Sequence, residues 1–147
     1  MTAPRFTLAG RVPAGVAVLG VPVYADLTSP AGAGASLDQE FLVQRRFEGK
    51  PGQAQAVLAD DATTEVALGV GPRDAVDAEA IRRAGAALAR QAGNATTLAT
   101  TLGTAGSDPE LIRAAVEGIG LGTYRFDGTR KSAPRLNELA QVVVVHW

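Results

Sequence analysis

Two apolar runs set the strongest limit on what this chain can fold into. Residues 16–23 are nearly continuous in Val, Leu and Ala, and residues 142–145 are four consecutive valines. A near-continuous run such as the first is typical of a strand that is covered on both faces of a sheet. Because it contains Gly20 and Pro22 and is far shorter than the roughly 20 residues that span a bilayer, we expect a buried strand and no membrane span.

Helical patterns alternate with the apolar strands. The clearest helix is predicted at residues 77–92, where apolar residues recur at spacings of three and four. Two more helices are predicted from reciprocal capping boxes, one formed by Ser36 with Gln39 and the other by Ser107 with Glu110. We expect Gly49 to end the first of them in a left-handed conformation.

Strand patterns fill the remaining segments, and two of them surround a polar turn as in a hairpin. The expected strands are residues 5–8, 16–24, 53–59, 65–70, 94–102 and 140–146. Helices that alternate with apolar strands indicate an α/β fold. We therefore predict a mixed, mostly parallel sheet of about six strands that is flanked by three helices.

Composition limits the organisation and the partners. The 147 residues fit one domain over residues 1–147, with a flexible Ser-, Pro-, Gly- and Ala-rich linker at residues 28–35. The absence of cysteine excludes thiol nucleophiles, thiolate zinc sites and disulfides, and it fits a cytoplasmic location. A net charge of −1 gives no long-range attraction to nucleic acid or to anionic lipid, so neither partner is expected.

The glycines Gly118, Gly120 and Gly122 form a G-x-G-x-G pattern that could suggest a nucleotide-binding loop. A phosphate-binding loop follows a strand and opens a helix, whereas these glycines lie within or at the end of the helix that begins near Ser107. The structural interpretation, which we favour, is that small residues let this helix end pack closely on the sheet.

A second candidate is the loop at residues 70–74, where a strand runs into Gly71 and then toward a helix. Helix N-termini in this position bind anions in α/β folds. Asp74 and Asp77 already stand at the helix start, where they would satisfy the same amides and repel phosphate. We favour helix capping over anion binding here.

The remaining polar residues give no catalytic or metal site. His146 is the single histidine and stands next to the last residue, which disfavours a Ser-His-Asp arrangement. Asp60 and Asp61 are neighbours in an expected turn, and Glu117 and Asp127 cannot be placed at an acid/base separation. A basic concentration at Arg125, Arg130, Lys131 and Arg135 is typical of a solvated or interface surface.

Four segments in order resemble the N-terminal domain of leucine aminopeptidases, the cytosol aminopeptidase family. Residues 117–127 with Lys131-Ser132 resemble the end of that domain, and residues 46–53 its turn between the first helix and the next strand. Residues 66–72 resemble its glycine-ended strand, and residues 77–90 its Ala- and Arg-rich helix. The resemblance covers roughly residues 37–146, and it departs from the family at Gly128-Thr129, where Arg or Lys and Tyr are frequent.

The resemblance implies a macro-domain-like fold in a hexameric, two-domain enzyme that removes N-terminal residues from peptides with two metal ions, usually zinc, manganese or magnesium. That chemistry belongs to the family's C-terminal domain, whose NTDAEGR-like motif does not occur in this chain. No catalytic, cofactor or metal residue can therefore be carried over to a position here. The chain could be a fragment of a longer enzyme or a natural stand-alone relative.

The resulting hypothesis is a non-catalytic N-terminal domain of a leucyl aminopeptidase-like metallo-exopeptidase. Its expected roles are to shape contacts with a catalytic C-terminal domain and other subunits, and to shape access to an active site that lies elsewhere. The alternative is a macro-domain-like module that binds ADP-ribose or a related nucleotide through the loop after Val70 and the glycines at 118–122.

Overall fold

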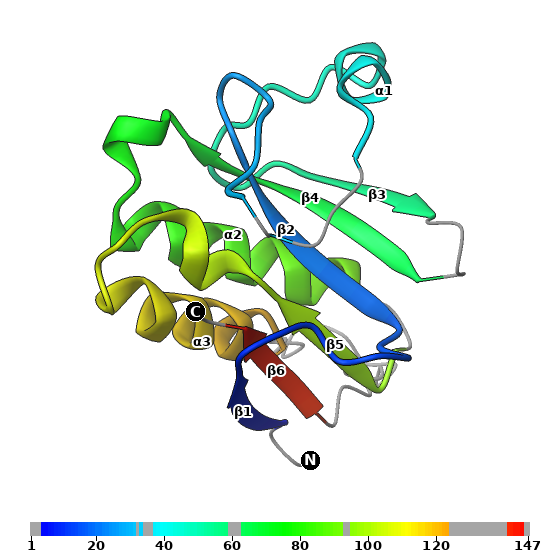
Figure 1. Cartoon of the computed structure of the whole chain (residues 1–147), viewed down its shortest axis with the longest axis vertical. Helices are drawn as coiled ribbons and strands as arrows, with labels where there is room; N and C mark the ends of the chain where they lie inside the picture. The colour runs from blue at the N-terminus through cyan, green and yellow to red at the C-terminus, as the bar shows by residue number, and fades with distance from the viewer. Residues whose placement is uncertain are drawn as a thin grey trace, which may run out of the picture.

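The computed structural model describes residues 4–31, 33, 37–58, 63–92, 95–123 and 141–145. These residues form an α/β sandwich with one sheet of six strands and three α-helices, as predicted (Figure 1). The elements in chain order are β1 (Arg5–Ala9), β2 (Val18–Tyr24), α1 (Gln39–Gln44), β3 (Ala54–Leu58), β4 (Thr64–Gly71), α2 (Ala78–Gln91), β5 (Thr97–Thr100), α3 (Glu110–Thr123) and β6 (Gln141–Val145). Short 3-10 turns follow β4 at Arg73–Ala75 and β5 at Leu102–Ala105.

The sheet has the strand order β1-β6-β5-β2-β4-β3 and is mixed but mostly parallel. Among the described strands, the antiparallel pair is the predicted hairpin of β3 and β4, in which Ala56 lies opposite Val66. The pairs β2–β4, β2–β5, β5–β6 and β1–β6 are parallel. The turn residues 59–62 of the hairpin lie outside the described part of the chain.

One face of the sheet packs against α2 and α3, which lie side by side in Figure 1. Even-numbered strand residues supply this face, among them Val66, Leu68 and Val142, all fully buried. They meet Ile81 and Leu88 of α2 in the main core. The two-residue alternation of strands and the 3.6-residue period of the helix thus bring the predicted apolar residues together.

The opposite face is covered by a thinner layer. Leu42 of α1 and Phe47 after it pack on Val23 and Ala67, while Ala33 lies in a second small cluster over β2 and β5. In Figure 1, α1 projects at the end of the molecule opposite β1. Both faces of β2 are covered, which accounts for its unbroken apolar sequence.

The capping boxes predicted for the first and third helices are wrong. Asp38, not Ser36, caps α1: its carboxylate accepts from the Glu40 amide at 2.9 Å, while Ser36 lies outside the described residues. At α3 the Glu110 amide donates to Asp108 at 2.9 Å rather than to Ser107. In both cases an aspartate stands closer to the helix and makes a charge-assisted bond that also suits the helix dipole.

The end of α1 also differs from the prediction. Arg46, with φ 61°, takes the left-handed conformation directly after the helix, and its amide donates to the Val43 carbonyl at 3.0 Å. Gly49 does have a positive φ, 74°, but it lies in the following turn. There its missing side chain is required for another reason, because a Cβ would run into the Tyr24 carbonyl.

Candidate functional site

Sheets of this class bind ligands beyond the carboxyl ends of parallel strands, at a point where neighbouring strands leave toward opposite faces. Here that point lies between β2 and β5. The chain leaves β2 toward α1 on one face, whereas it leaves β5 toward α3 on the other. The carboxyl ends of β2, β4 and β5 are therefore the first place to look for a site.

The crevice between β2 and β5 is filled by the chain itself. Thr100 and Thr101 are fully buried, and the Thr100 hydroxyl donates to the Gly20 carbonyl at 3.0 Å. The Thr101 hydroxyl donates to the Ala33 carbonyl at 3.1 Å. This hydrogen bond holds Ala33, whose exposed fraction is 3%, over the ends of the strands. The polar groups of the crevice are thus satisfied internally and offer little to a ligand.

A second set of side chains joins the ends of β2 and β4. Tyr24 is buried and donates its hydroxyl proton to the Ala105 carbonyl at 2.7 Å. The guanidinium of Arg73 lies 4.3 Å from the Tyr24 ring centre and donates to the Thr28 hydroxyl at 2.8 Å. Burial raises the pKa of Tyr24, against a smaller lowering by Arg73. These contacts fill the space at the carboxyl ends of β2 and β4, so they leave no opening for a ligand between Tyr24 and Arg73.

Thr28, the first residue of the predicted linker, is held by hydrogen bonds near the carboxyl ends of the same two strands. The amide and hydroxyl of Thr28 both donate to the carboxylate of Asp26, at 3.1 and 2.5 Å. These two bonds, with a smaller effect of Arg73, lower the pKa of Asp26. Sequence reasoning missed Tyr24, Asp26 and Thr28, although a tyrosine at the end of an otherwise aliphatic buried strand is a usable signal.

The loop after Val70 does not present free amides in the way an anion site requires. The amide of Gly71 donates to the Gly49 carbonyl at 2.8 Å, and Gly71 accepts from the Ala25 amide at 3.0 Å. Asp77 caps α2 by accepting from the Ala80 amide at 2.9 Å, as expected. Asp74 instead lies in the exposed 3-10 turn, so only one of the two predicted aspartates is the cap.

The glycine pattern at 118–122 serves contact between helices. A Cβ on Gly118 would run into the Arg82 carbonyl of α2, and one on Gly122 would lie 2.7 Å from the Ala86 carbonyl. On the other side of the contact, Gly85 would meet the Ala115 carbonyl at 2.9 Å. The partner of this helix end is therefore α2 and not the sheet. Gly118 and Gly122 thus lie against α2, while Gly120 has nothing within 4 Å of an added Cβ. All three lie within α3 and do not form a nucleotide loop.

Glu117 takes part in exposed ion pairs across the two helices. It accepts from Arg82 at 3.2 Å and lies 3.5 Å from Arg113, while Arg82 also pairs with Glu79 at 2.9 Å. Bonds from Arg83 and Arg82 lower the pKa of Glu79, and bonds to Glu117 and Glu79 raise the pKa of Arg82. Exposed pairs of this kind contribute little stability. They suit a surface role rather than acid/base chemistry.

Several residues weighed from the sequence lie outside the described part of the chain: Asp60, Asp61, Arg125, Asp127, Arg130, Lys131, Arg135 and His146. Within the described residues, no group of three or more His, Cys, Asp or Glu side chains could hold a metal ion. The same part of the chain contains no helix long and apolar enough to cross a membrane.

An open groove of about 580 Å³ lies beside α1, between the turn after β2 and the segment after the helix. It is lined by Ala25, Leu27, Val43, Arg46, Phe47, Glu48 and Lys50. A neighbouring hollow of about 340 Å³ lies on the other side of Leu27. No sequence pattern indicates this groove, because its lining comes from two loops and a six-residue helix.

Comparison with known proteins decides the family. The family model described as "Cytosol aminopeptidase family, N-terminal domain" matches residues 21–133. The chain belongs to the cytosol aminopeptidase family. It corresponds to the N-terminal domain of that family, as the four sequence segments indicated.

Curated relatives and solved structures agree with this domain assignment. Probable cytosol aminopeptidases from Nocardia farcinica and Corynebacterium glutamicum are 42% identical over 108 residues and 35% identical over 95 residues. These alignments span 67% and 63% of this chain but only 20% and 18% of the relatives, so the chain spans about a fifth of their length.

Two solved structures of different similarity share the fold. The bottromycin maturation enzyme BotP matches with a TM-score of 0.68 and 31% identity, over 90% of this chain and 28% of that chain. The cytosol aminopeptidase from Coxiella burnetii matches with a TM-score of 0.58 and 17% identity, over 95% of this chain and 28% of that chain, which shows the fold alone.

Proposed function

We propose that this chain is a non-catalytic N-terminal domain of a leucyl aminopeptidase-like metallo-exopeptidase, and that it contributes to subunit assembly and to active-site access. The observation that carries the proposal is the match to the family's N-terminal domain across residues 21–133, in a chain that spans about a fifth of its curated relatives. The catalytic domain and the other subunits are the proposed partners, and the cytoplasm is the proposed location.

The donor chemistry supports placing the metals elsewhere. Two divalent ions need several carboxylate or imidazole ligands that converge from different segments. Among the described acids, Asp77 instead caps a helix, and Glu79 and Glu117 form surface ion pairs. These residues do not fit a two-metal centre, so zinc, manganese or magnesium would be held by the catalytic domain.

The activity of the 147-residue chain on a leucyl chromogenic substrate, with manganese added, tests the proposal. We expect no turnover above the buffer blank, while a full-length cytosol aminopeptidase, such as the relative from Nocardia farcinica, assayed in parallel serves as the positive control. Turnover that co-purifies with the chain and disappears with a chelator would overturn the proposal.

The ADP-ribose alternative is less well supported. Its candidate contacts were the loop after Val70 and the glycines at 118–122, but the Gly71 amide is bonded within the fold and Gly118 is covered by α2. Calorimetric titration with ADP-ribose separates the two functions. An assembly domain gives no saturable heat, whereas a macro-type binding module would give a saturating isotherm.

A further inference from the structure

β1 is an edge strand whose outer side carries unpaired backbone groups in the described part of the chain. It lies at the end of the sheet and pairs with β6. The Gln141 amide donates to the Thr96 carbonyl, so Gln141 turns its backbone groups toward β5. The next residue of β6, Val142, therefore turns its own toward β1. In this register the amides and carbonyls of Phe6 and Leu8 face away from the sheet.

This outer edge of β1 lacks the features that usually protect an edge strand. Natural edges carry charges, prolines or bulges that prevent another strand from pairing. From Phe6 to Ala9, β1 contains no charged residue and no proline, and its pairing with β6 runs without a register shift. Leu8 is 64% exposed, and Phe6 on the same face is half-buried. An added strand would therefore meet both backbone partners and apolar side chains.

The opposite edge of the sheet, β3, is less accessible. The Gly69 amide donates to the Gln53 carbonyl, so the register turns the backbone groups of Ala56 and Leu58 outward. The Gln55 side chain, however, donates to the Ala56 carbonyl at 3.0 Å and occupies the central acceptor of that edge. Strand addition at β3 would first have to break this bond.

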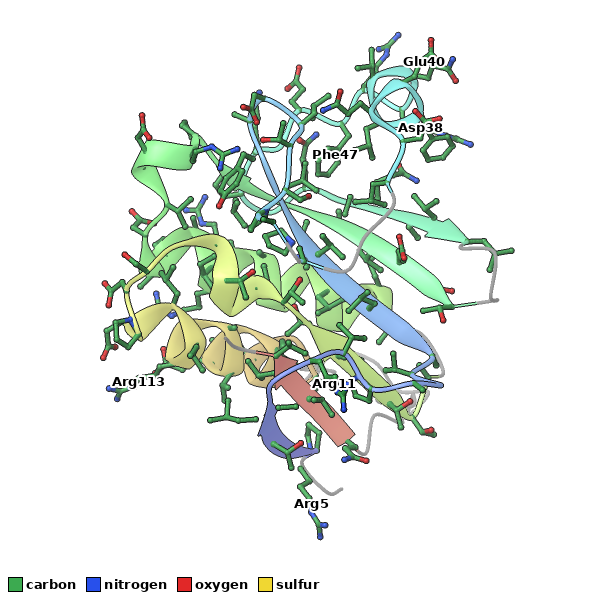
Figure 2. All side chains as sticks on the ribbon, in the orientation of Figure 1. Arg5, Arg11, Asp38, Glu40, Phe47 and Arg113 are labelled. Carbon is green, nitrogen blue, oxygen red and sulfur yellow. The ribbon has the colours of Figure 1, made fainter. Side chains whose placement is uncertain are left out.

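Two arginines give the β1 end of the molecule a positive charge. Arg5 begins β1, and Arg11 lies two residues beyond its end. Both are exposed, and neither forms an ion pair with another described residue. Figure 2 shows both at the end of the molecule opposite Glu40. Unpaired cations beside an open strand favour acidic side chains in the polypeptide that pairs there.

The chemistry of this edge selects an extended peptide over other ligands. Donors and acceptors that alternate at the spacing of a strand are matched by another backbone, and not by a nucleotide or a lipid headgroup. A second copy of this chain fits less well. Two copies of β1 in antiparallel pairing would bring Arg5 of one toward Arg11 of the other, and like charges placed opposite each other are destabilising.

We propose that β1 binds an extended, acidic peptide segment by strand addition, through backbone hydrogen bonds to Phe6 and Leu8 and through carboxylates that pair with Arg5 and Arg11. Alternate side chains of the peptide lie against Leu8 on the helix-bearing face of the sheet. This binding goes beyond the assembly and access roles proposed above and does not depend on them.

Fluorescence anisotropy with the full 147-residue chain tests the proposal. The probe is a labelled peptide of about seven residues that alternates valine with threonine and carries glutamate at both ends. We expect saturable binding with a dissociation constant below about 1 mM. The same peptide with lysine at both ends should bind roughly tenfold more weakly or worse.

N-methylated peptides test strand addition directly on the wild-type chain. Alternate amides of an added strand face β1, and the others face solvent. Methylation of one alternate set should therefore abolish binding, while methylation of the other set should be tolerated. Equal effects of the two sets, or no saturable binding of the unmethylated probe at 1 mM, would contradict the proposal.

Leu8→Pro tests the edge in the protein. The Leu8 amide faces outward, so proline removes a donor from the edge without removing a hydrogen bond to β6. It should weaken peptide binding by roughly tenfold or more. Leu58→Pro makes the same change at an exposed leucine on the β3 edge and should leave binding unchanged. Circular dichroism and urea midpoints confirm that both variants fold.

Arg5→Glu tests the charge. It should weaken binding of the glutamate-ended peptide and strengthen binding of the lysine-ended one, because it reverses the charge at one end of the strand. Unchanged binding in both Leu8→Pro and Arg5→Glu would show that the peptide lies elsewhere. Sedimentation equilibrium gives the remaining check: wild-type self-association that Leu8→Pro abolishes would make a second copy the occupant of the edge and would remove the peptide assignment.

Discussion

The backbone carbonyl of Arg82 on α2 occupies the space where a side chain on Gly118 of α3 would lie. Together with Gly85 and Gly122, this contact lets the two helices approach closely and cover one face of the sheet as a pair. The close approach of α2 and α3 depends on residues without a Cβ. Substituting alanine for these glycines therefore measures how much the approach contributes to stability.

Gly118→Ala should lower the free energy of unfolding by about 1–3 kcal/mol, because α2 and α3 must move apart to admit the Cβ. Gly120→Ala is the control in the same helix, since nothing lies within 4 Å of its added Cβ. Alanine there should be neutral or should stabilise by up to about 1 kcal/mol through helix propensity. Urea denaturation measures both variants, and equal midpoints for the two would contradict the packing interpretation.

Gly49→Ala should be more damaging than Gly52→Ala. Both glycines have positive φ, 74° and 95°, so both variants carry a backbone cost of about 1–2 kcal/mol. Only the Cβ at Gly49 also meets other atoms, namely the Tyr24 carbonyl and the Cα of Ala25 at 2.9 Å. We expect a total loss of about 2–5 kcal/mol at this position. Thermal unfolding of the two variants side by side checks the difference, and similar losses would show that the collision is relieved.

The buried hydroxyl of Tyr24 makes the free energy of unfolding depend on pH in the alkaline range. Burial raises its pKa above the ordinary value of 10.0, so the fold favours the neutral phenol. This contribution is fully present below pH 10 and is lost as the pH rises through the higher pKa of the folded state. Urea midpoints of the wild type should therefore fall between pH 8 and pH 11.

Tyr24→Phe separates this group from other alkaline titrations. At pH 8 the variant should lose about 1–3 kcal/mol, because the Ala105 carbonyl is left without its donor. Its further loss between pH 8 and pH 11 should be smaller than that of the wild type. Parallel curves for the two proteins would mean that Tyr24 does not titrate in this range.

Asp77→Ala should destabilise the chain by about 1 kcal/mol, since the Ala80 amide loses its acceptor at the start of α2. Asp74→Ala removes a charge three residues earlier from an exposed turn and should change stability by less than about 0.5 kcal/mol. Chemical denaturation at pH 7 compares the two. An equal effect of both variants would return Asp74 to the capping role that the sequence suggested.

The sequence was sufficient where burial creates a period. The alternation in β4 and the helical spacing around Ile81 and Leu88 arise because one face of each element packs against the core. These elements could therefore be predicted from the sequence, whereas the order of the strands in the sheet could not. Helix starts were less predictable. Asp38 and Asp108 each lie within two residues of a serine that fits the same capping pattern, and only the backbone path decides which side chain reaches the amides.

The α1 groove and the closed strand ends could not be predicted for a different reason. Tyr24 and Arg73 are 49 positions apart in the sequence. Leu27 and Arg46 line the same groove, although residues 28–45 separate them. Contacts of this kind depend on how β2 and β4 are placed next to each other in the sheet. A family resemblance supplies that placement, while composition and spacing do not.

The pairing of β1 with β6 has a consequence for synthesis. Arg5 lies beside Gln141 and Ala9 beside Val145, so the first strand has no neighbour until residues 141–145 have been synthesised. β6 must also enter between β1 and β5. On the ribosome, β1 therefore stays unpaired until β6 emerges, and docking of the five residues of β6 is expected to be a slow, late event in the folding of this sheet.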